Sequence, residues 1–183
     1  MVEEDVTLGR LLLTEYQSIK EEQKARIGFR DNLLYVTLTV VAVVVAAAAQ
    51  AKQTAMLLAL PPVCVVLGWT YLVNDEKITA IGRYIRNDLG PRLAQLAYVE
   101  KTFGWEFTNR EDPGRRFRKI IQCVVDLLAF CVVPLSALVA YWSGGQTAPG
   151  LLILSVGEAL AVSGLGGFIV RFAVPFGSES EGR

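Results

Sequence analysis

Two carboxylic acids lie inside long apolar stretches, and they have the clearest capacity for chemistry in this chain. Asp126 lies in the stretch 120–142, and Glu158 lies in the stretch 150–174. On a helix that begins at Ile120, Asp126 is about 9 Å from the start. A carboxylate in the core of a bilayer is costly, so such residues usually face protein or water and often mark an ion pathway. We therefore expect Asp126 and Glu158 to be pathway residues or intramembrane polar contacts.

Each acid also has a less specific interpretation. Asp126 can reach the membrane boundary or pair with Arg118 or Lys119. Glu158 can be a protonated carboxyl that hydrogen-bonds a neighbouring helix. The sequence leaves both alternatives open.

Other chemistry has little support. The chain contains no histidine, which removes the commonest general base and metal ligand. Its three cysteines, Cys64, Cys123 and Cys131, all fall in apolar runs, where we expect small buried hydrophobic side chains. No phosphate-binding loop and no serine-nucleophile motif is present. We expect a protein that is not an enzyme and that uses no metal or cofactor. The net charge of +0 gives no reason to expect nucleic acid as a partner.

The distribution of charge predicts the fold class. Hydrophobic residues make up 52% of the chain, and the charged 20% gather mainly in 1–32 and 74–119. Between them lie four apolar stretches of the length that spans a bilayer. The links near residue 52 and residue 146 are too short for anything but antiparallel neighbours. We predict an all-α polytopic membrane protein with four transmembrane helices in two hairpins and a cytoplasmic helical bundle.

The predicted segments begin and end where the charge and the hydropathy change along the chain. They are an N-terminal cytoplasmic amphipathic helix (1–32), a first transmembrane hairpin (33–73), cytoplasmic helices with a basic loop (74–119), a second transmembrane hairpin (120–174) and a mobile tail (175–183).

Apolar side chains also form helical stripes outside the spans. The stripes predict two cytoplasmic helices that pack on each other, because the first hairpin brings them side by side. Gly90-Pro91 should end the second helix near Leu89, with a shorter helix continuing to about Lys101. The stripes are Leu8, Leu12, Tyr16 and Ile19 in one helix, and Ile78, Ile81, Ile85, Leu89, Leu93 and Leu96 in the other.

Three further features concern packing and lipid. Small residues every four positions in the last span allow close helix packing, within the chain or with another copy. Pro61-Pro62 and Pro134 should bend their spans and free backbone carbonyls. A basic cluster before the third span is a candidate for lipid headgroup contacts, or a plain positive-inside loop. The small residues are Ser155, Ala159, Ser163 and Gly167, and the basic cluster is Arg115, Arg116, Arg118 and Lys119.

Two segments carry a resemblance to known proteins. Glu15–Ile27 and Leu67–Ile78 resemble segments of uncharacterised small integral membrane proteins of bacteria, over residues 15–93, and this implies no activity. The layout of a cytoplasmic helix, a two-span hairpin and a returning helix is similar to the SLATT effectors of bacterial conflict systems. That similarity implies a membrane pore, although no residue motif carries over and the second hairpin is a departure.

Together these features predict an oligomeric integral protein of the bacterial inner (plasma) membrane that forms an ion-conducting pore. Its partners would be the lipid bilayer and other copies of itself. The alternative is a membrane scaffold or sensor whose cytoplasmic helices bind a protein partner.

The positions of the basic residues predict the orientation. Five Lys or Arg residues lie in 1–32 and ten in 74–119, but only Lys52 lies in the two hairpin tips. Lys and Arg stay on the cytoplasmic side, so both termini and the middle loop should be cytoplasmic. A cysteine placed at Gln146 should react with an impermeant thiol reagent from outside the cell, and one at Asn109 should not. The reverse pattern of labelling would contradict this orientation.

Overall fold

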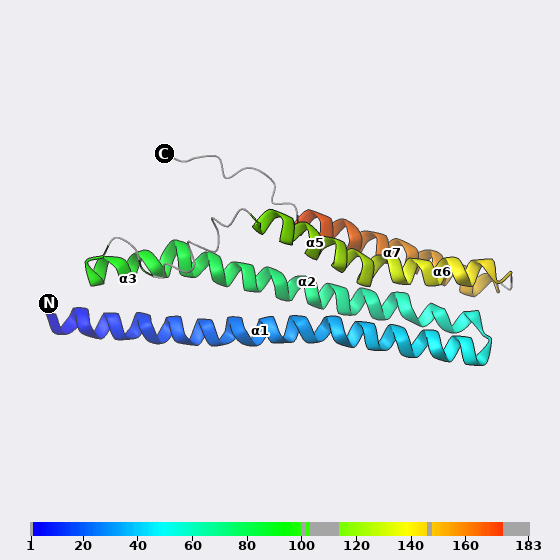
Figure 1. The fold of residues 1–183 in the computed structure, drawn as a ribbon, viewed down its shortest axis with the longest axis horizontal. Coiled ribbons are helices and arrows are strands. Elements are labelled where there is room, and N and C mark those ends of the chain that lie inside the picture. Colours follow the sequence, from blue (N-terminus) through cyan, green and yellow to red (C-terminus); the bar gives the residue numbers. More distant parts are fainter. Residues whose placement is uncertain (1, 100–101, 103–113, 146–147, 174–183) are drawn as a thin grey trace. The chain divides into compact units, whose positions relative to one another are not determined.

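The structure, a computed structural model, describes residues 2–99, 102, 114–145 and 148–173, and the regular structure among them is entirely helical. The predicted all-α class is confirmed, and four stretches are long and apolar enough to cross a membrane. Figure 1 shows the helices along the chain. They are α1 (Val2–Ala51), the 3₁₀ helix η1 (Thr54–Ala59), α2 (Leu60–Tyr84), the π turn η2 (Ile85–Leu89), α3 (Gly90–Ala97), α5 (Arg115–Leu127), the π turn η3 (Leu128–Val132), α6 (Val133–Ser143) and α7 (Pro149–Ala173).

The chain divides into two units, each described by itself. The first unit comprises Met1–Asp31 and Val73–Arg116, and the second comprises Asn32–Leu72 and Phe117–Arg183. The tail 175–183 and the loop 103–113 lie outside the described residues.

In the first unit, α1 and α2 run antiparallel and side by side (Figure 1). An apolar cluster joins them, and Ile85 and Leu89 are completely buried in it. The predicted packing of the two stripes is confirmed at Leu12, Ile85 and Leu89, whereas Leu8 is 47% exposed and lies outside the cluster. The cluster consists of Leu12, Ile85, Leu89 and Leu93, with Tyr16, Ile19, Ile81, Tyr84 and Leu96 packed against it.

Polar contacts continue the same helix pair toward Asp31. The Arg30 guanidinium donates to Asp75 at 2.8 Å, and the Asn74 amide donates to the backbone carbonyl of Arg26 at 2.6 Å. Asn74 is 5% exposed, so this hydrogen bond satisfies a group that would be costly to bury alone. The first unit is thus held by apolar contacts near Leu12 and by side-chain hydrogen bonds near Arg26.

Two prolines are accommodated by π turns and not by helix breaks. Proline has no N–H for the carbonyl four residues earlier, and its ring crowds that carbonyl. In η2 the N–H of Gly90, just before Pro91, bonds the Ile85 carbonyl five residues back. In η3 the N–H of Val133, just before Pro134, does the same with Leu128. A one-residue bulge of this kind lets a helix continue past the proline.

The helix predicted to end near Leu89 therefore continues through η2 into α3. The α3 helix ends at Ala97, whereas the sequence predicted that it would continue to about Lys101. Tyr98 follows in the left-handed conformation, with φ of 53°. The irregularity at Gly90-Pro91 was correctly located, but the helix does not break there. The sequence pattern shows the missing donor and not how the backbone absorbs it.

Pro61 and Pro62 have a different role from the predicted bend within a span. They are the second and third residues of α2, and proline is well tolerated at the start of an α-helix. The residues before them, Thr54–Ala59, form the 3₁₀ helix η1. The second apolar stretch is thus a 3₁₀ segment followed by an α-helix.

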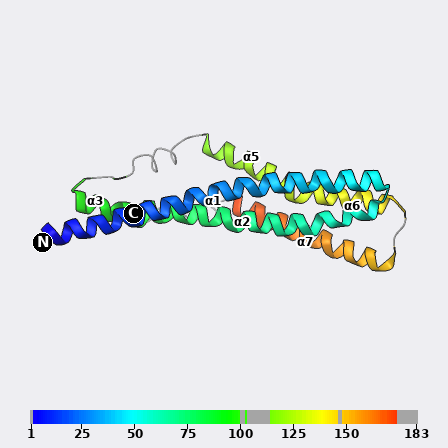
Figure 2. The ribbon, with the colours of Figure 1, turned by 90° about the horizontal axis from the view of Figure 1, so that it is seen from below.

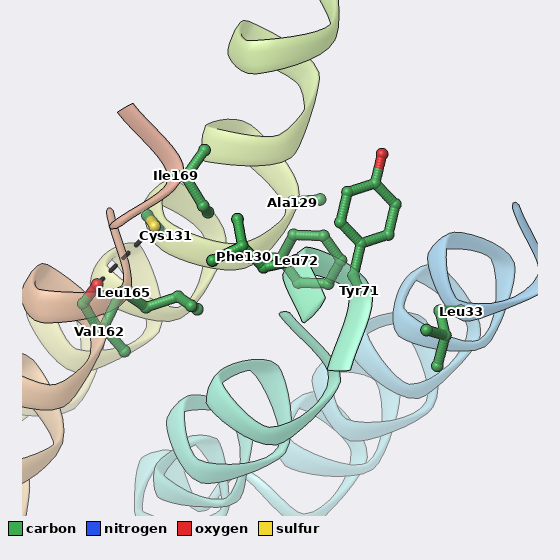
Figure 3. Close-up of a cluster of buried hydrophobic side chains, with 9 residues drawn as sticks. All are labelled: Leu33, Tyr71, Leu72, Ala129, Phe130, Cys131, Val162, Leu165 and Ile169. Carbon is green, nitrogen blue, oxygen red and sulfur yellow. Dashed lines mark hydrogen bonds between the residues drawn. The ribbon is translucent and has the colours of Figure 1, made fainter. Parts of the chain in front are cut away.

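The second unit has an apolar core in which α2, η3 and α7 meet (Figure 3). Phe130 and Val162 are fully buried there, and Tyr71 packs on Phe130 with ring centroids 5.3 Å apart. The α6 and α7 helices run antiparallel, as Figure 1 and Figure 2 show. The core residues are Leu33, Tyr71, Leu72, Ala129, Phe130, Cys131, Val162, Leu165 and Ile169.

This core requires a glycine at position 68. A Cβ atom there would lie 2.7 Å from Leu165 Cδ2 and 3.0 Å from the Phe130 ring, whereas one at Gly164 would meet nothing within 4 Å. We expect Gly68→Ala to lower the free energy of unfolding in detergent by about 1–3 kcal/mol, as overpacking does. The matched change Gly164→Ala should be neutral or stabilising by up to ~1 kcal/mol. Equal stabilities of the two variants would show that the core does not close as described.

Candidate functional site

Glu158 is a buried carboxyl on the packed face of α7. The residue is 9% exposed, and its Oε2 atom has no hydrogen-bond partner among the described residues. Ser155 and Val162, at helical spacing on either side, are fully buried on the same face. Glu158 thus faces other helices of the protein, which is one of the two environments expected for an intramembrane acid.

The α6 helix packs against α7 close to this carboxyl. Trp142 Nε1 donates to Ser155 Oγ at 2.9 Å, one helical turn before Glu158. Ala159, the next residue after Glu158, packs on a small cluster of Leu58 and Tyr141 that also contains Leu138. The Tyr141 ring is 2% exposed, and its hydroxyl also has no partner in the described part of the chain. Two unpartnered polar groups thus lie on facing helices.

Asp126 lies in a different environment. It is 7% exposed, and its Oδ1 accepts a hydrogen bond from Gln122 Nε2 at 2.9 Å, one turn earlier on α5. Gln122 also donates to the Tyr71 hydroxyl on α2 at 2.6 Å. In Figure 3 this hydroxyl points away from the apolar cluster. Asp126 therefore belongs to a polar group that joins α5 to α2.

The two acids do not form a pair. Trp142 on α6 contacts Ser155 on α7. Because these helices are antiparallel, Glu158 lies at the same height as Val139 on α6. That level is 13 residues beyond Asp126 along the same helical stretch, or roughly 20 Å at the rise of an α-helix. The apolar core around Phe130 and Val162 lies between them. The second unit thus has two separate polar sites with a hydrophobic layer in between.

Sequence reasoning missed Tyr71, Gln122 and Tyr141 as members of these sites. Tyr71 and Tyr141 are at span ends, which favours an interfacial position for an aromatic ring with a polar tip, but both are buried. The spacing of Gln122 four residues before Asp126 was an available signal, because residues at that spacing are neighbours on a helix. Nothing local in the sequence marks Tyr141 as buried.

The row of small residues is divided by the structure. Ser155 and Ala159 pack within the chain, whereas Ser163 and Gly167 are exposed. Gly166, which is outside the predicted row, packs closely against η3, since a Cβ there would lie 3.2 Å from Cys131 Sγ. Close packing at Ser163 and Gly167 stays a prediction about another copy.

The cysteines lie within α2, α5 and η3, and the basic cluster lies at the start of α5. Cys64 and Cys131 are buried and Cys123 is partly buried, all as free thiols, and Cys131 Sγ lies 3.8 Å from the Val162 carbonyl (Figure 3). Among the described residues, no three His, Cys, Asp or Glu side chains gather as a metal site would require. Arg118 and Lys119 are exposed, and the side chains of Arg115 and Arg116 lie outside the described part.

Among the described residues of the first unit, Tyr84 has a shifted pKa. The Tyr84 hydroxyl donates to the Glu15 carboxylate at 2.6 Å, and this hydrogen bond, with smaller effects of burial and nearby charges, raises the pKa of Tyr84. A carboxylate acceptor stabilises the protonated phenol. The contact is a structural link between α1 and α2 at neutral pH, because the phenol stays protonated there.

Comparison with known proteins adds no relative to this picture. No protein-family model matches the chain, and no curated protein or solved structure matches it.

Proposed function

We propose that the chain is an integral membrane protein of a bacterial inner membrane, which crosses the bilayer four times as two hairpins. Four helices have the necessary length and apolar composition. The excess of Lys and Arg in 1–32 and 74–119 favours a cytoplasmic location for these segments and for both termini. Arg118 and Lys119 would then lie at the headgroup level.

We further propose that the protein is oligomeric and conducts ions across the membrane. The observation that carries this proposal is the buried carboxyl of Glu158, whose Oε2 has no partner among the described residues. Intramembrane carboxyls are costly and are usually retained for a role in transport or in polar contacts.

The second unit supports this function by its order of polar and apolar layers. Glu158 and Tyr141 lie at one level, and Asp126, Gln122 and Tyr71 lie at another. The core between them, filled by Phe130 and Val162, would be the closed barrier. Hydrophobic constrictions of this kind gate channels by excluding water.

Oligomerisation is supported by a different face of α7. Gly157 and Gly167 are exposed, and a Cβ at either of them would meet nothing within 4 Å. Small residues on a lipid-facing helix allow a second helix to approach closely. The layout similarity to pore-forming SLATT effectors points to the same function.

A scaffold or sensor is the second candidate, and it is favoured by apolar side chains of the first unit. Leu8, Leu11 and Leu13 on α1 are 47%, 64% and 50% exposed. Exposed leucines on a cytoplasmic helix are suited to binding another protein. This reading predicts no conductance from the purified chain.

Electrical recording from the purified chain in planar bilayers separates the two functions. The parent protein should conduct, and Glu158→Gln should lower the conductance by at least about tenfold, the effect of ~1.4 kcal/mol on a barrier, or remove its pH dependence. Glutamine keeps the shape and hydrogen-bonding capacity of the side chain but not its charge. Glu76→Gln, an exposed acid on α2, is the matched control and should conduct as the parent does.

Two results would count against the pathway. Current no greater than that of an empty bilayer would favour the scaffold. Equal conductance of Glu158→Gln and the parent, with Glu158→Leu altering only the oligomeric state, would make the carboxyl a helix-packing group.

A further inference from the structure

The surroundings of Glu158 contain no positive charge that could stabilise a carboxylate. The apolar stretches 32–50, 54–72 and 120–170 contain no Lys, Arg or His, and their only acids are Asp126 and Glu158. An ionised carboxylate that is buried without a counter-ion is strongly disfavoured, and the group neutralises by binding a proton. The other titratable side chains in these stretches are Tyr35 on α1, Cys64 and Tyr71 on α2, Cys123 and Cys131 on α5 and η3, and Tyr141 on α6.

The available ligands fit a proton better than a metal cation. Hard cations take six or more oxygen ligands. On the facing helix α6, the Tyr141 hydroxyl is also buried without a partner among the described residues, and those residues contain no cluster of three potential His, Cys, Asp or Glu ligands. One carboxyl and one hydroxyl can hold a proton but do not make a cation cage.

A hydrogen-bond acceptor for a protonated Glu158 is indicated by the register of α2 and α7. Gly68 lies against Leu165, and Trp69 lies edge-on to Phe168 with ring centroids 5.7 Å apart. The α2 and α7 helices run in the same direction. Two turns before Gly68 is the start of α2, and two turns before Leu165 is Glu158. The same register therefore brings Glu158 beside the start of α2. Ala159 packs on the cluster of Leu58, Leu138 and Tyr141, which is compatible with this alignment.

The start of α2 has a backbone carbonyl that lacks an N–H donor three or four residues later. The Leu57 carbonyl receives the N–H of Leu60. The Leu58 carbonyl would receive an N–H from residue 61 or 62, but both are proline and have none. Leu58 is 7% exposed, so water has little access to this carbonyl, and a buried acceptor of this kind needs a donor.

We propose that Glu158 binds a proton in the folded helix bundle and, as a neutral carboxylic acid, donates it to the backbone carbonyl of Leu58. The proposal deepens the proposed function at the same site, because it makes a proton the ion that the site takes. The Tyr141 hydroxyl lies on the opposite helix as a second polar group for proton exchange.

Infrared spectra of the full-length chain in liposomes at neutral pH test the proton directly. The parent should show a protonated-carboxyl C=O band that Glu158→Gln lacks and Glu76→Gln keeps. Identical spectra of the parent and Glu158→Gln would mean that Glu158 is ionised, which overturns the proposal. Pro62→Ala restores an N–H for Leu58, so the band should shift to higher frequency as the acid loses its acceptor. An unshifted band would overturn Leu58 as the acceptor.

Labelling with dicyclohexylcarbodiimide distinguishes a proton from a metal cation. The protonated carboxyl adds across one C=N bond of the reagent, its proton passes to the nitrogen, and the acyl group then migrates to give a stable N-acylurea. We expect mass spectrometry to find this adduct on Glu158 at neutral pH and to find less of it as the pH is raised. Sodium chloride at constant pH should not protect. Protection by sodium would identify a cation site and overturn the proposal.

These outcomes are independent of conduction. A protonated Glu158 in a chain that carries no current would leave the proton site in place and remove the proposed function. If conductance depends on Glu158 but its carboxyl is ionised, the proposed function would stand and the proton site would be ruled out.

Discussion

Apolar side chains on the outer faces of the second unit set the constraint on which everything else depends. Tyr35, Ile153 and Leu160 are 67%, 74% and 70% exposed, and many Val, Leu and Ile side chains of the same helices are exposed with them. A water-soluble domain rarely exposes so much contiguous apolar surface. A bilayer would satisfy this surface, and in lipid every backbone polar group would have to be paired within the protein. Helices joined by short tips meet that requirement.

The same constraint makes each buried polar group inside the second unit informative. Asp126 has a donor one turn away in Gln122, so its burial is compensated locally. Glu158 has no such donor in the described chain. The 3₁₀ segment η1 and the two prolines after it leave a carbonyl without a helical donor at the same level. A proton on Glu158 is the simplest way to satisfy both groups.

The sequence predicts the helices and their pairing well, because both follow from local patterns. The stripe that includes Ile81, Ile85 and Leu89 packs on Leu12 as its spacing predicts. The outcome at the prolines was not predictable in the same way. Pro61 and Pro62 mark a helix start, whereas Pro91 and Pro134 follow π turns, and the choice depends on which neighbouring helices the backbone must fit.

The candidate site was predictable only in part. Glu158 and Asp126 are conspicuous because charges are rare in apolar stretches. Tyr71 and Tyr141 were not recognised, because a tyrosine at the end of a span suits an interface and a core equally well by composition. Their burial is decided by Phe130 in one case and by Leu58 and Leu138 in the other, which are contacts between residues far apart in the chain.

Hydrogen–deuterium exchange of the full chain reconstituted in lipid bilayers tests the central claim, that the second unit is embedded in lipid and the first unit is in water. Amides in 150–170 and 120–142 should stay protected long after those of Leu8–Leu13 and Tyr98–Val99 have exchanged, because the bilayer core has no water to support exchange. Exchange in 150–170 as fast as at Leu8–Leu13 would contradict the account.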